Sequence, residues 1–480
     1  MTAERADLVV VGAGAAGLFA CLCAAREGAG VALVSARPLA ETASYWAQGG
    51  LAAALTVDDA PARHLEDTIV AGRGLVRRSA AEVLTNEAPD RFRDLEALGV
   101  RFDADRHGNV ALGLEGGHSA RRVAHAGGSA TGRRILRQLS ADVAEHPSID
   151  VLEGARAASL LADGTVTGVR LEDGRTIAAR GTILATGGAA ALWSRTTNPP
   201  GSFGSGLLLA RAAGAALADL EFVQFHPTAV VGIRGREGFL ITEAIRGEGA
   251  TLHDQNGERF VDELAPRDAV ARAIFRTLRE QGTTSVSLDM RHVDPARFPN
   301  VVAALREAGL DPATELVPVA PASHYVMGGI VTDLEGRSQV PGLYAVGESA
   351  CTGLHGANRL ASNSLSECFV FGRRAALRAL DEAPPTATPA APPELDIAPA
   401  PTRDTRKAMW RHAGLERDAQ GLAPLLDDPH PLARLVAQSA LFRQESRGAH
   451  ARADFPDTDP ALDERHTVTD DGAPRLERWF

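Results

Sequence analysis

The stretch DLVVVGAGAAG at residues 7–17 decides the fold. A short β-branched run ends in Gly12-x-Gly14-x-x-Gly17, an alanine- and leucine-rich stretch follows, and VALVSA (31–36) is a second β-branched run. Glycines at this spacing allow a tight turn and let a pyrophosphate approach the first turn of a helix, whose free N–H groups bind its charge. The pattern predicts a β-α-β unit that binds a dinucleotide.

The end of the second run argues against a plain NAD site. An NAD-binding unit carries an acid there to bind a ribose hydroxyl, and here Ser35 and Ala36 take that place. Two later apolar strands favour FAD, because ATGG (185–188) and GLYAVGE (342–348) stand where such a fold contacts a flavin dinucleotide. Glu348 can accept hydrogen bonds from cofactor hydroxyls; the alternative is a surface acid at a strand end.

The block between these two strands predicts an inserted domain. It spans about 150 residues rich in arginine, histidine and glutamate, and the flanking strands belong to one sheet type. Seven of the 18 residues 384–401 are proline, which makes a semi-rigid extended linker, and helical patterns follow it. We predict an α/β fold with a discontinuous Rossmann-like FAD-binding domain, an inserted α+β capping domain, a linker and a short C-terminal helical region. The FAD-binding domain is predicted at 1–218 and 326–383, and the capping domain at 219–325. The linker is predicted at 384–401 and the C-terminal region at 402–480.

The composition of the 480-residue chain excludes several classes of function. The formal net charge is −11, whereas a protein that binds nucleic acid needs a basic face. Lys407 is the single lysine and lies in a charged segment. A pyridoxal-phosphate enzyme needs a Schiff-base lysine and a P-loop ATPase needs a phosphate-loop lysine. Neither class fits, and we expect no metal site.

The cysteines and the N-terminus predict a cytoplasmic protein. Cys21, Cys23, Cys351 and Cys368 form no CxxC pair and no disulfide framework, and we expect each to be a small packing residue. The uncharged stretch 8–25 is interrupted by glycines and follows acidic residues. We therefore predict neither a signal peptide nor a membrane span.

Six further motifs, in order along the chain, carry a resemblance to a known family. They are ASYWAQGGLAAA (43–54), QFHPT (224–228), TEAIRGEGA (242–250), ELAPRD (263–268), HYVMGGI (324–330) and GLHGANRLASNSLSE (353–367). The chain resembles the succinate dehydrogenase, fumarate reductase and L-aspartate oxidase flavoproteins from about residue 7 to 380, and again at QESRGAHARADFP (444–456). The resemblance implies that FAD is held by Gly12, Gly14, Ala15, Ala16, Gly17, Ser35, Ser44, Gln48, Gly49, Gly50, Ala157, Thr186, Gly187, Ser205, Glu348, Ser364 and Leu365.

Three features favour the aspartate oxidase branch of this family. Members resembling succinate dehydrogenase carry a histidine that links covalently to FAD, and here that position is Ala43, which implies non-covalent FAD. LEGGHSARRVAHAGGSATGRRI (114–135) has Glu115 where the dicarboxylate dehydrogenases carry glutamine. Aspartate differs from succinate by an α-ammonium, which a carboxylate can bind. LASNSL (360–365) is also closer to the aspartate oxidase form.

The other substrate contacts predicted by the resemblance suit a C4 dicarboxylate. Separate motifs supply hydrogen-bond donors for its two carboxylates, namely His226, Thr242, His324 and Arg359. Arg359 can bind a carboxylate in a bidentate fork. For each histidine, the alternative is a structural residue with satisfied hydrogen bonds.

A second implication of the resemblance is that Arg267 carries the proton. This is chemically awkward, because a guanidinium normally stays protonated. Glu243 and Arg246 lie three residues apart, so that on one helical face they could pass a proton to Arg267. The alternative is a purely structural Arg–Glu–Arg ion network.

Two positions depart from the family pattern. Members usually have Gly-Asp-Gly after the ATGG strand, where this chain has Gly204-Ser205-Gly206. Ser205 can still form hydrogen bonds but brings no charge. The lysine usual after the serine of the second strand is also absent, since Ala36 stands there. Both changes bear on the affinity for FAD.

We therefore expect FAD-dependent oxidation of L-aspartate to iminoaspartate at the entry to NAD biosynthesis. Electrons would pass to O2, giving H2O2, or to fumarate, giving succinate, and iminoaspartate would go to quinolinate synthase. A monomer or homodimer is expected. One alternative is a soluble fumarate reductase or succinate dehydrogenase flavoprotein, and another is a non-catalytic protein on the same scaffold. A tRNA-modifying flavoprotein is disfavoured by the charge of −11.

Overall fold

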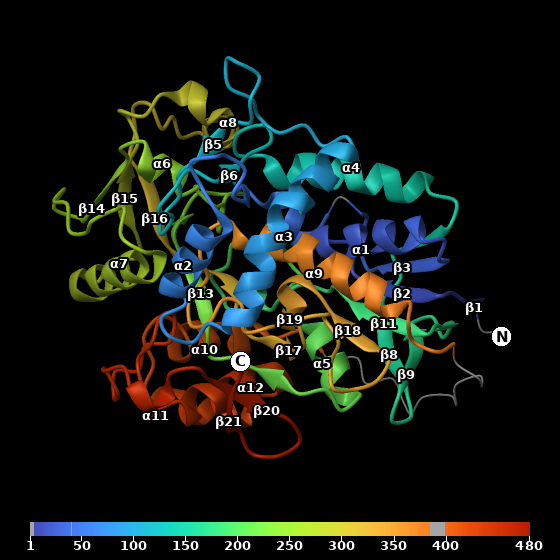
Figure 1. Ribbon diagram of the computed structural model, residues 1–480. Helices are drawn as coiled ribbons and strands as arrows, with labels where there is room; N and C mark the ends of the chain where they lie inside the picture. Colours follow the sequence, from blue (N-terminus) through green and yellow to red (C-terminus); the bar gives the residue numbers. More distant parts are fainter. Residues whose placement is uncertain (1–3, 40, 385–398) are drawn as a thin grey trace.

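The β-α-β unit predicted at the N-terminus is present in the computed structural model, which describes residues 4–39, 41–384 and 399–480 (Figure 1). It consists of β2 (Leu8–Val11), α1 (Ala15–Arg26) and β3 (Val31–Ser35). A Cβ atom on Gly17 would lie 1.9 Å from the carbonyl oxygen of Gly12. Glycine at this position therefore lets α1 pack directly against the turn that follows β2.

A five-stranded parallel sheet is the centre of the FAD-binding region. Its order is β18 (Leu343–Ala345), β11 (Gly181–Leu184), β2, β3 and β7 (Ile149–Glu153). The two strands that flank the predicted insertion, β11 and β18, pair with each other. That pairing confirms that chain segments more than 150 residues apart belong to one sheet.

Both faces of this sheet are covered, which explains why its strands are apolar throughout. On one face the side chains of Leu8 and Val10 pack with α1, α4 (Thr131–Glu145) and α9 (Asn363–Ala379). On the other face Val9 and Val11 pack against a second sheet (Figure 1). That sheet has the order β1 (Glu4–Arg5), β10 (Thr176–Ala178), β9 (Val166–Leu171) and β8 (Ala157–Ala162).

The inserted region has its own antiparallel sheet and apolar core. The strand order is β13 (Val223–Val230), β16 (Val317–Val326), β15 (Val286–Asp289) and β14 (Thr251–His253). Its helices are α6 (Ala244–Gly247), α7 (Arg267–Gln281) and α8 (Pro299–Glu307). All four strands lie within residues 223–326; the precise domain limits stay predictions.

The remaining elements connect these layers. Helices α2 (Pro61–Ala71) and α3 (Arg78–Ala97) pack with α9, and α5 (Ser205–Ala212) follows the ATGG segment. A small sheet of β4 (Leu51–Ala52), β6 (Val123–Ala124) and β5 (Leu112–Gly113) supports the 114–128 loop. Across the described ranges, no helix combines the length and the apolar character needed to cross a membrane.

The C-terminal region is helical only in its first half. It contains α10 (Arg403–His412), α11 (Ala419–Leu422) and α12 (Pro431–Phe442), and then β20 (Arg465–Thr469) and β21 (Arg475–Arg478). β20 pairs with β12 (Leu217–Ala218), in a sheet that also holds β17 (Gly329–Val331) and β19 (Ala350–Cys351). The predicted C-terminal helical region therefore ends partly in strands, because the β-branched segment 467–469 pairs with the edge of β12. Except for its ends, the predicted linker 384–401 lies outside the described residues.

Candidate active site

A cavity of about 520 Å3 opens where β2, β3 and β11 end and extends to β13 and β16 of the capping region. Ligands of open α/β sheets bind beyond the carboxyl ends of the strands, so this position is the expected one. The cavity is lined by all the predicted site residues except Gly17 and Arg246. Those that line it are Gly12, Gly14, Ala15, Ala16, Ser35, Ser44, Gln48, Gly49, Gly50, Glu115, Ala157, Thr186, Gly187, Ser205, His226, Thr242, Glu243, Arg267, His324, Glu348, Arg359, Ser364 and Leu365.

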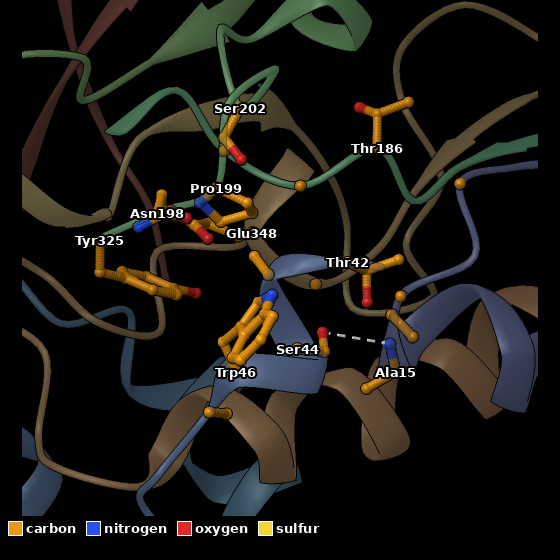
Figure 2. Close-up of a pocket in the computed structure, with 18 of the residues that line it drawn as sticks. Ala15, Thr42, Ser44, Trp46, Thr186, Asn198, Pro199, Ser202, Tyr325 and Glu348 are labelled. Atoms are coloured by element: carbon orange, nitrogen blue, oxygen red, sulfur yellow. Dashed lines mark hydrogen bonds between the residues drawn. The ribbon is translucent and has the colours of Figure 1, made fainter. Parts of the chain in front are cut away.

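The wall near β2 and β11 is shaped by close backbone approaches. A Cβ atom on Gly12 would lie 2.2 Å from the carbonyl oxygen of Ala185, and Gly12 has a φ of +112°. The backbone N–H of Ala15 donates to Ser44 Oγ at 3.2 Å, which joins the start of α1 to the Ala43–Trp46 turn (Figure 2). This glycine-lined floor fits the pyrophosphate of FAD.

Glu348 is the acid of this wall. Its Oε1 accepts the backbone N–H of Val326 at 3.0 Å, and a Cβ on Gly188 would lie 2.2 Å from the same oxygen. Burial raises the pKa of Glu348 to about 8. A carboxyl group held this way is suited to hydroxyl partners such as those of FAD, and Figure 2 shows it pointing into the cavity.

Ser205 is the first residue of α5 and lines the cavity. Gly204 before it adopts a left-handed conformation with a φ of 73°. The hydroxyl at the helix start can donate to a cofactor oxygen, whereas the aspartate of related chains would bring a charge. The family departure seen in the sequence thus falls directly on the cavity wall.

Arg359 lies at the other end of the cavity and is 4% exposed. Its Nη2 donates to Gln224 Oε1 at 3.0 Å, and its guanidinium lies 4.6 Å from the ring centre of Tyr325. Nε has no hydrogen-bond partner within the described part of the chain. Burial lowers the pKa of Arg359 to about 10, which leaves it cationic at neutral pH. A buried, partly unsatisfied guanidinium fits a carboxylate ligand.

The two predicted histidines lie next to each other. The ring centres of His226 and His324 are 5.3 Å apart. Burial lowers the pKa of both well below its usual value, and the nearby arginines act in the same direction. His226 Nδ1 accepts the backbone N–H of Thr228 at 3.3 Å, so the neutral ring carries its proton on Nε2. His226 can thus donate a hydrogen bond from Nε2 without adding charge, and His324 Nδ1 lies 2.8 Å from Thr197 Oγ1.

Arg267 and Glu243 form a close ion pair at the cavity wall. Arg267 Nε donates to Glu243 Oε2 at 2.5 Å, and Arg246 Nη2 lies 3.8 Å from the same oxygen. Burial opposes the charge of Glu243, but Arg267 and Arg246 outweigh it and lower the pKa of this carboxyl. Arg246 lies behind Glu243, outside the cavity, and donates to the carbonyl of Glu263. The predicted Arg–Glu–Arg grouping is therefore present, with one cavity-facing cation.

Glu115 brings a carboxylate to the same cavity. Ser362 Oγ donates to its Oε2 at 2.6 Å, and His125 Nε2 lies 3.4 Å from its Oε1. Burial would raise the pKa of Glu115, but the hydrogen bond and charge of His125, then Ser362 and Arg267, lower it to about 2. Glu115 thus places a carboxylate that no arginine side chain pairs with directly in a cavity that also holds Arg267 and Arg359.

Sequence reasoning missed several residues of this site. Gln224 accepts from both Arg359 and Arg267, at 3.0 and 3.3 Å, and lies in the quoted QFHPT motif. His125 and Ser362 lie in quoted motifs as well, and both contact Glu115, which is ten residues from His125 but 247 residues from Ser362. Further lining residues, shown in Figure 2, are Thr42, Trp46, Asn198, Pro199, Ser202 and Tyr325. Cys368, expected only to pack, also lines the cavity, and all four cysteines are free.

Known proteins are similar to this chain in both sequence and fold. Residues 7–365 match the family described as FAD binding domain, and residues 425–478 match the fumarate reductase flavoprotein C-terminus. The L-aspartate oxidase of Caulobacter vibrioides is 47% identical, with 97% of this chain and 96% of that protein covered. The enzyme of the same name from Streptomyces coelicolor is 42% identical, covering 97% and 91%.

Solved structures extend the similarity to the whole chain. The FrdA chain of E. coli quinol fumarate reductase superimposes with a TM-score of 0.89 at 29% identity, covering 99% of this chain and 97% of that one. The Sdh1 complex of Mycobacterium smegmatis gives a TM-score of 0.85 at 29% identity, covering 100% and 95%. Together with the glycine-lined cavity, these similarities establish FAD as the cofactor, and the chain belongs to the L-aspartate oxidase family of FAD-binding flavoproteins.

Proposed function

We propose that this protein oxidises L-aspartate to iminoaspartate with non-covalently bound FAD. The observation that carries the proposal is the Glu115 carboxylate in the cavity that also holds Arg359 and Arg267. L-Aspartate has two carboxylates and one ammonium, and this charge arrangement is its complement. Ala43 has no side-chain nucleophile for a covalent link to the flavin.

Different residues bind the carboxylates and the ammonium of the substrate. Arg359 binds one carboxylate through its two-pronged guanidinium, and His226, His324 and Thr242 donate hydrogen bonds to the carboxylates. Glu115 binds the ammonium. The glycine-lined floor and Glu348 would hold FAD, which would supply the hydride acceptor and the route of the electrons to O2 or fumarate. Displacement of water by the substrate would strengthen each of these contacts.

Arg267 is the proposed proton carrier. Its guanidinium faces the cavity and is paired with Glu243, which its two arginine neighbours keep ionised. Proton exchange through Glu243 and Arg246 would restore Arg267 after each turnover. If the three residues form only a structural network, turnover will survive the loss of Arg267.

We further propose that the reaction is the first step of NAD biosynthesis in the cytoplasm. The names of the relatives and the free cysteines support this setting. Iminoaspartate is the form of the product that quinolinate synthase would consume, and the protein would act as a monomer or homodimer.

Anaerobic mixing of the FAD-loaded protein with L-aspartate tests the activity directly. We expect the flavin absorbance to bleach with L-aspartate faster than with succinate. Bleaching with succinate alone would instead identify a succinate dehydrogenase or fumarate reductase flavoprotein. A preparation that binds no FAD would indicate a non-catalytic protein.

The variant Glu115→Gln separates aspartate from plain dicarboxylates. It keeps the size of the side chain and removes the charge, so we expect kcat/KM for L-aspartate to fall about 5–150-fold, equivalent to roughly 1–3 kcal/mol for a partly wet ion pair. Fumarate reduction should stay unchanged or improve. Glu41→Gln, which alters an exposed carboxylate elsewhere on the cavity wall, is the matched control. An equal fall for both substrates would show that Glu115 does not bind the ammonium.

A further inference from the structure

His125 contacts Glu115 but does not itself line the cavity. Its Nε2 lies 3.4 Å from Glu115 Oε1, while Ser362 holds Oε2 at 2.6 Å. Glu115 and Ser362 line the cavity and His125 is not among the lining residues, so the carboxylate stands between the imidazole and the substrate space. The His125 side chain is 19% exposed, which keeps a route for protons to solvent.

The imidazole is held in place from several sides. It follows β6, and a Cβ on Gly113 of β5 would lie 2.9 Å from its Cε1. Its backbone carbonyl accepts the N–H of Asp103 at 2.8 Å. The Asp103 carboxylate in turn accepts the N–H groups of Gly127 and Gly128, each at 2.7 Å. This framework fixes the backbone that presents the ring to Glu115.

The charges that face this pair determine its protonation. Glu115 and Asp103 act on His125, and together they outweigh burial and raise its pKa above the usual value. On the cavity side Arg267 acts on Glu115, and Glu243 and His118 also lie within its electrostatic reach. Glu115 therefore favours the protonated form of His125 before any substrate arrives.

A substrate ammonium competes with His125 for the same carboxylate. When the ammonium binds Glu115, two cations would share one anion, which favours loss of the His125 proton to solvent. Succinate and fumarate bring two negative charges and no cation, so they favour the protonated imidazole. Charge is balanced in both cases, because one cation pairs with Glu115 throughout.

We propose that His125 is a positioning residue whose protonation selects the substrate: protonated, it neutralises Glu115 for plain dicarboxylates, and neutral, it leaves Glu115 to the ammonium of L-aspartate. This inference rests on the proposed function. Because His125 loses its proton as the pH rises, the preference for L-aspartate over fumarate should increase with pH, although neither molecule contacts His125.

The test compares kcat/KM for L-aspartate oxidation and for fumarate reduction between about pH 5.5 and 8.5, below the ionisation of the substrate ammonium. In the FAD-loaded wild-type protein, the aspartate-to-fumarate ratio should rise at least about threefold over this range. In His125→Gln, which keeps a hydrogen-bond donor without a titratable charge, the ratio should not change with pH. His107→Gln, at an exposed histidine, should behave as wild type.

Binding of succinate supplies a second measurement that needs no variant. Calorimetry of the FAD-loaded protein in two buffers of different ionisation enthalpy should show proton uptake on binding, approaching one proton at a pH where His125 is largely neutral. A wild-type protein that takes up no proton over this pH range overturns the inference, as does a His125→Gln ratio that keeps the wild-type rise with pH. If wild-type flavin is not reduced by L-aspartate at all, it is the proposed function that fails.

Discussion

At the level of single residues, the side-chain amide of Gln224 forms three hydrogen bonds with two arginines of the site. Gln224 Oε1 accepts from Arg359 and Arg267, and its Nε2 donates to the Arg359 carbonyl at 2.8 Å. The amide thereby fixes the spacing of the two guanidiniums without neutralising either. A dicarboxylate site needs this, because a carboxylate in the same place would consume the positive charge that binds the substrate.

Arg359→Lys should raise KM for L-aspartate strongly. A lysine ammonium is a point charge that cannot reproduce the bidentate fork, and charged hydrogen bonds are worth about 1.5–3 kcal/mol each. We expect KM to increase roughly 10–100-fold, measured by initial rates. Arg378→Lys, at an exposed pair with Asp381 at the end of α9, is the control. An unchanged KM would remove Arg359 from the substrate site.

Arg267→Leu should lose turnover while keeping its yellow colour. A positioned proton-transfer group contributes on the order of 10²–10⁴ in rate, and Arg267 lies outside the glycine-lined floor that fits FAD. Arg272→Leu, one turn along α7 and outside the cavity, should keep wild-type rates. Turnover within a few-fold of wild type in Arg267→Leu would mean that the proton travels elsewhere.

The sequence predicted the site residues that lie in recognisable motifs, but not the residues that hold them in place. His226, His324 and Arg359 lie in short motifs whose residue types already indicate anion binding. Ser362 and Glu115, by contrast, are 247 residues apart, and only the folded chain brings them within 2.6 Å. His125 is unremarkable in sequence, because a lone histidine gives no sign of which carboxylate it will face.

At the level of elements, helix α1 shows why the glycine fingerprint is predictive. The carbonyl oxygen of Gly12 occupies the space beside Gly17, so the helix can approach the turn only if position 17 has no side chain. Strand β20, by contrast, was not predicted, since the sequence indicated a helical region at 402–480. Its short alternating pattern needs the edge of β12 to become a strand, and that edge is supplied from more than 240 residues away.

Gly17→Ala should abolish FAD binding. The added Cβ would meet backbone at 1.9 Å, so α1 must shift and the pyrophosphate floor with it. We expect a colourless or weakly coloured protein with a lower melting temperature, compared by absorbance and calorimetry. Gly30→Ala is the matched control, because its Cβ would have only an ordinary contact at 3.7 Å with Asp7. A yellow, stable Gly17→Ala protein would contradict the close-packing argument.

At the level of the whole molecule, a buried network attaches the C-terminal region to the rest of the chain. Arg443 donates to Glu221 at 2.6 Å and to Glu445 at 2.8 Å, and these three side chains are fully buried. Thr467 of β20 also donates to Glu221, at 2.7 Å. His430 of the same C-terminal region lines the FAD cavity. The network therefore couples the position of this region to the cofactor site.

Arg443→Met should destabilise the protein by about 3–5 kcal/mol, because it leaves the buried Glu221 carboxylate without its cation, whereas Glu445 keeps its pair with Arg447. The change would be measured as the free energy of unfolding in urea. Arg475→Met removes a half-exposed pair with Asp470 and Glu477, and should cost less than about 1 kcal/mol. Adding Glu221→Gln to Arg443→Met should recover part of the loss, since the unpaired charge is then gone. If the double variant is as unstable as the sum of both single changes, the two residues act independently, and the C-terminal region is held by its apolar contacts instead.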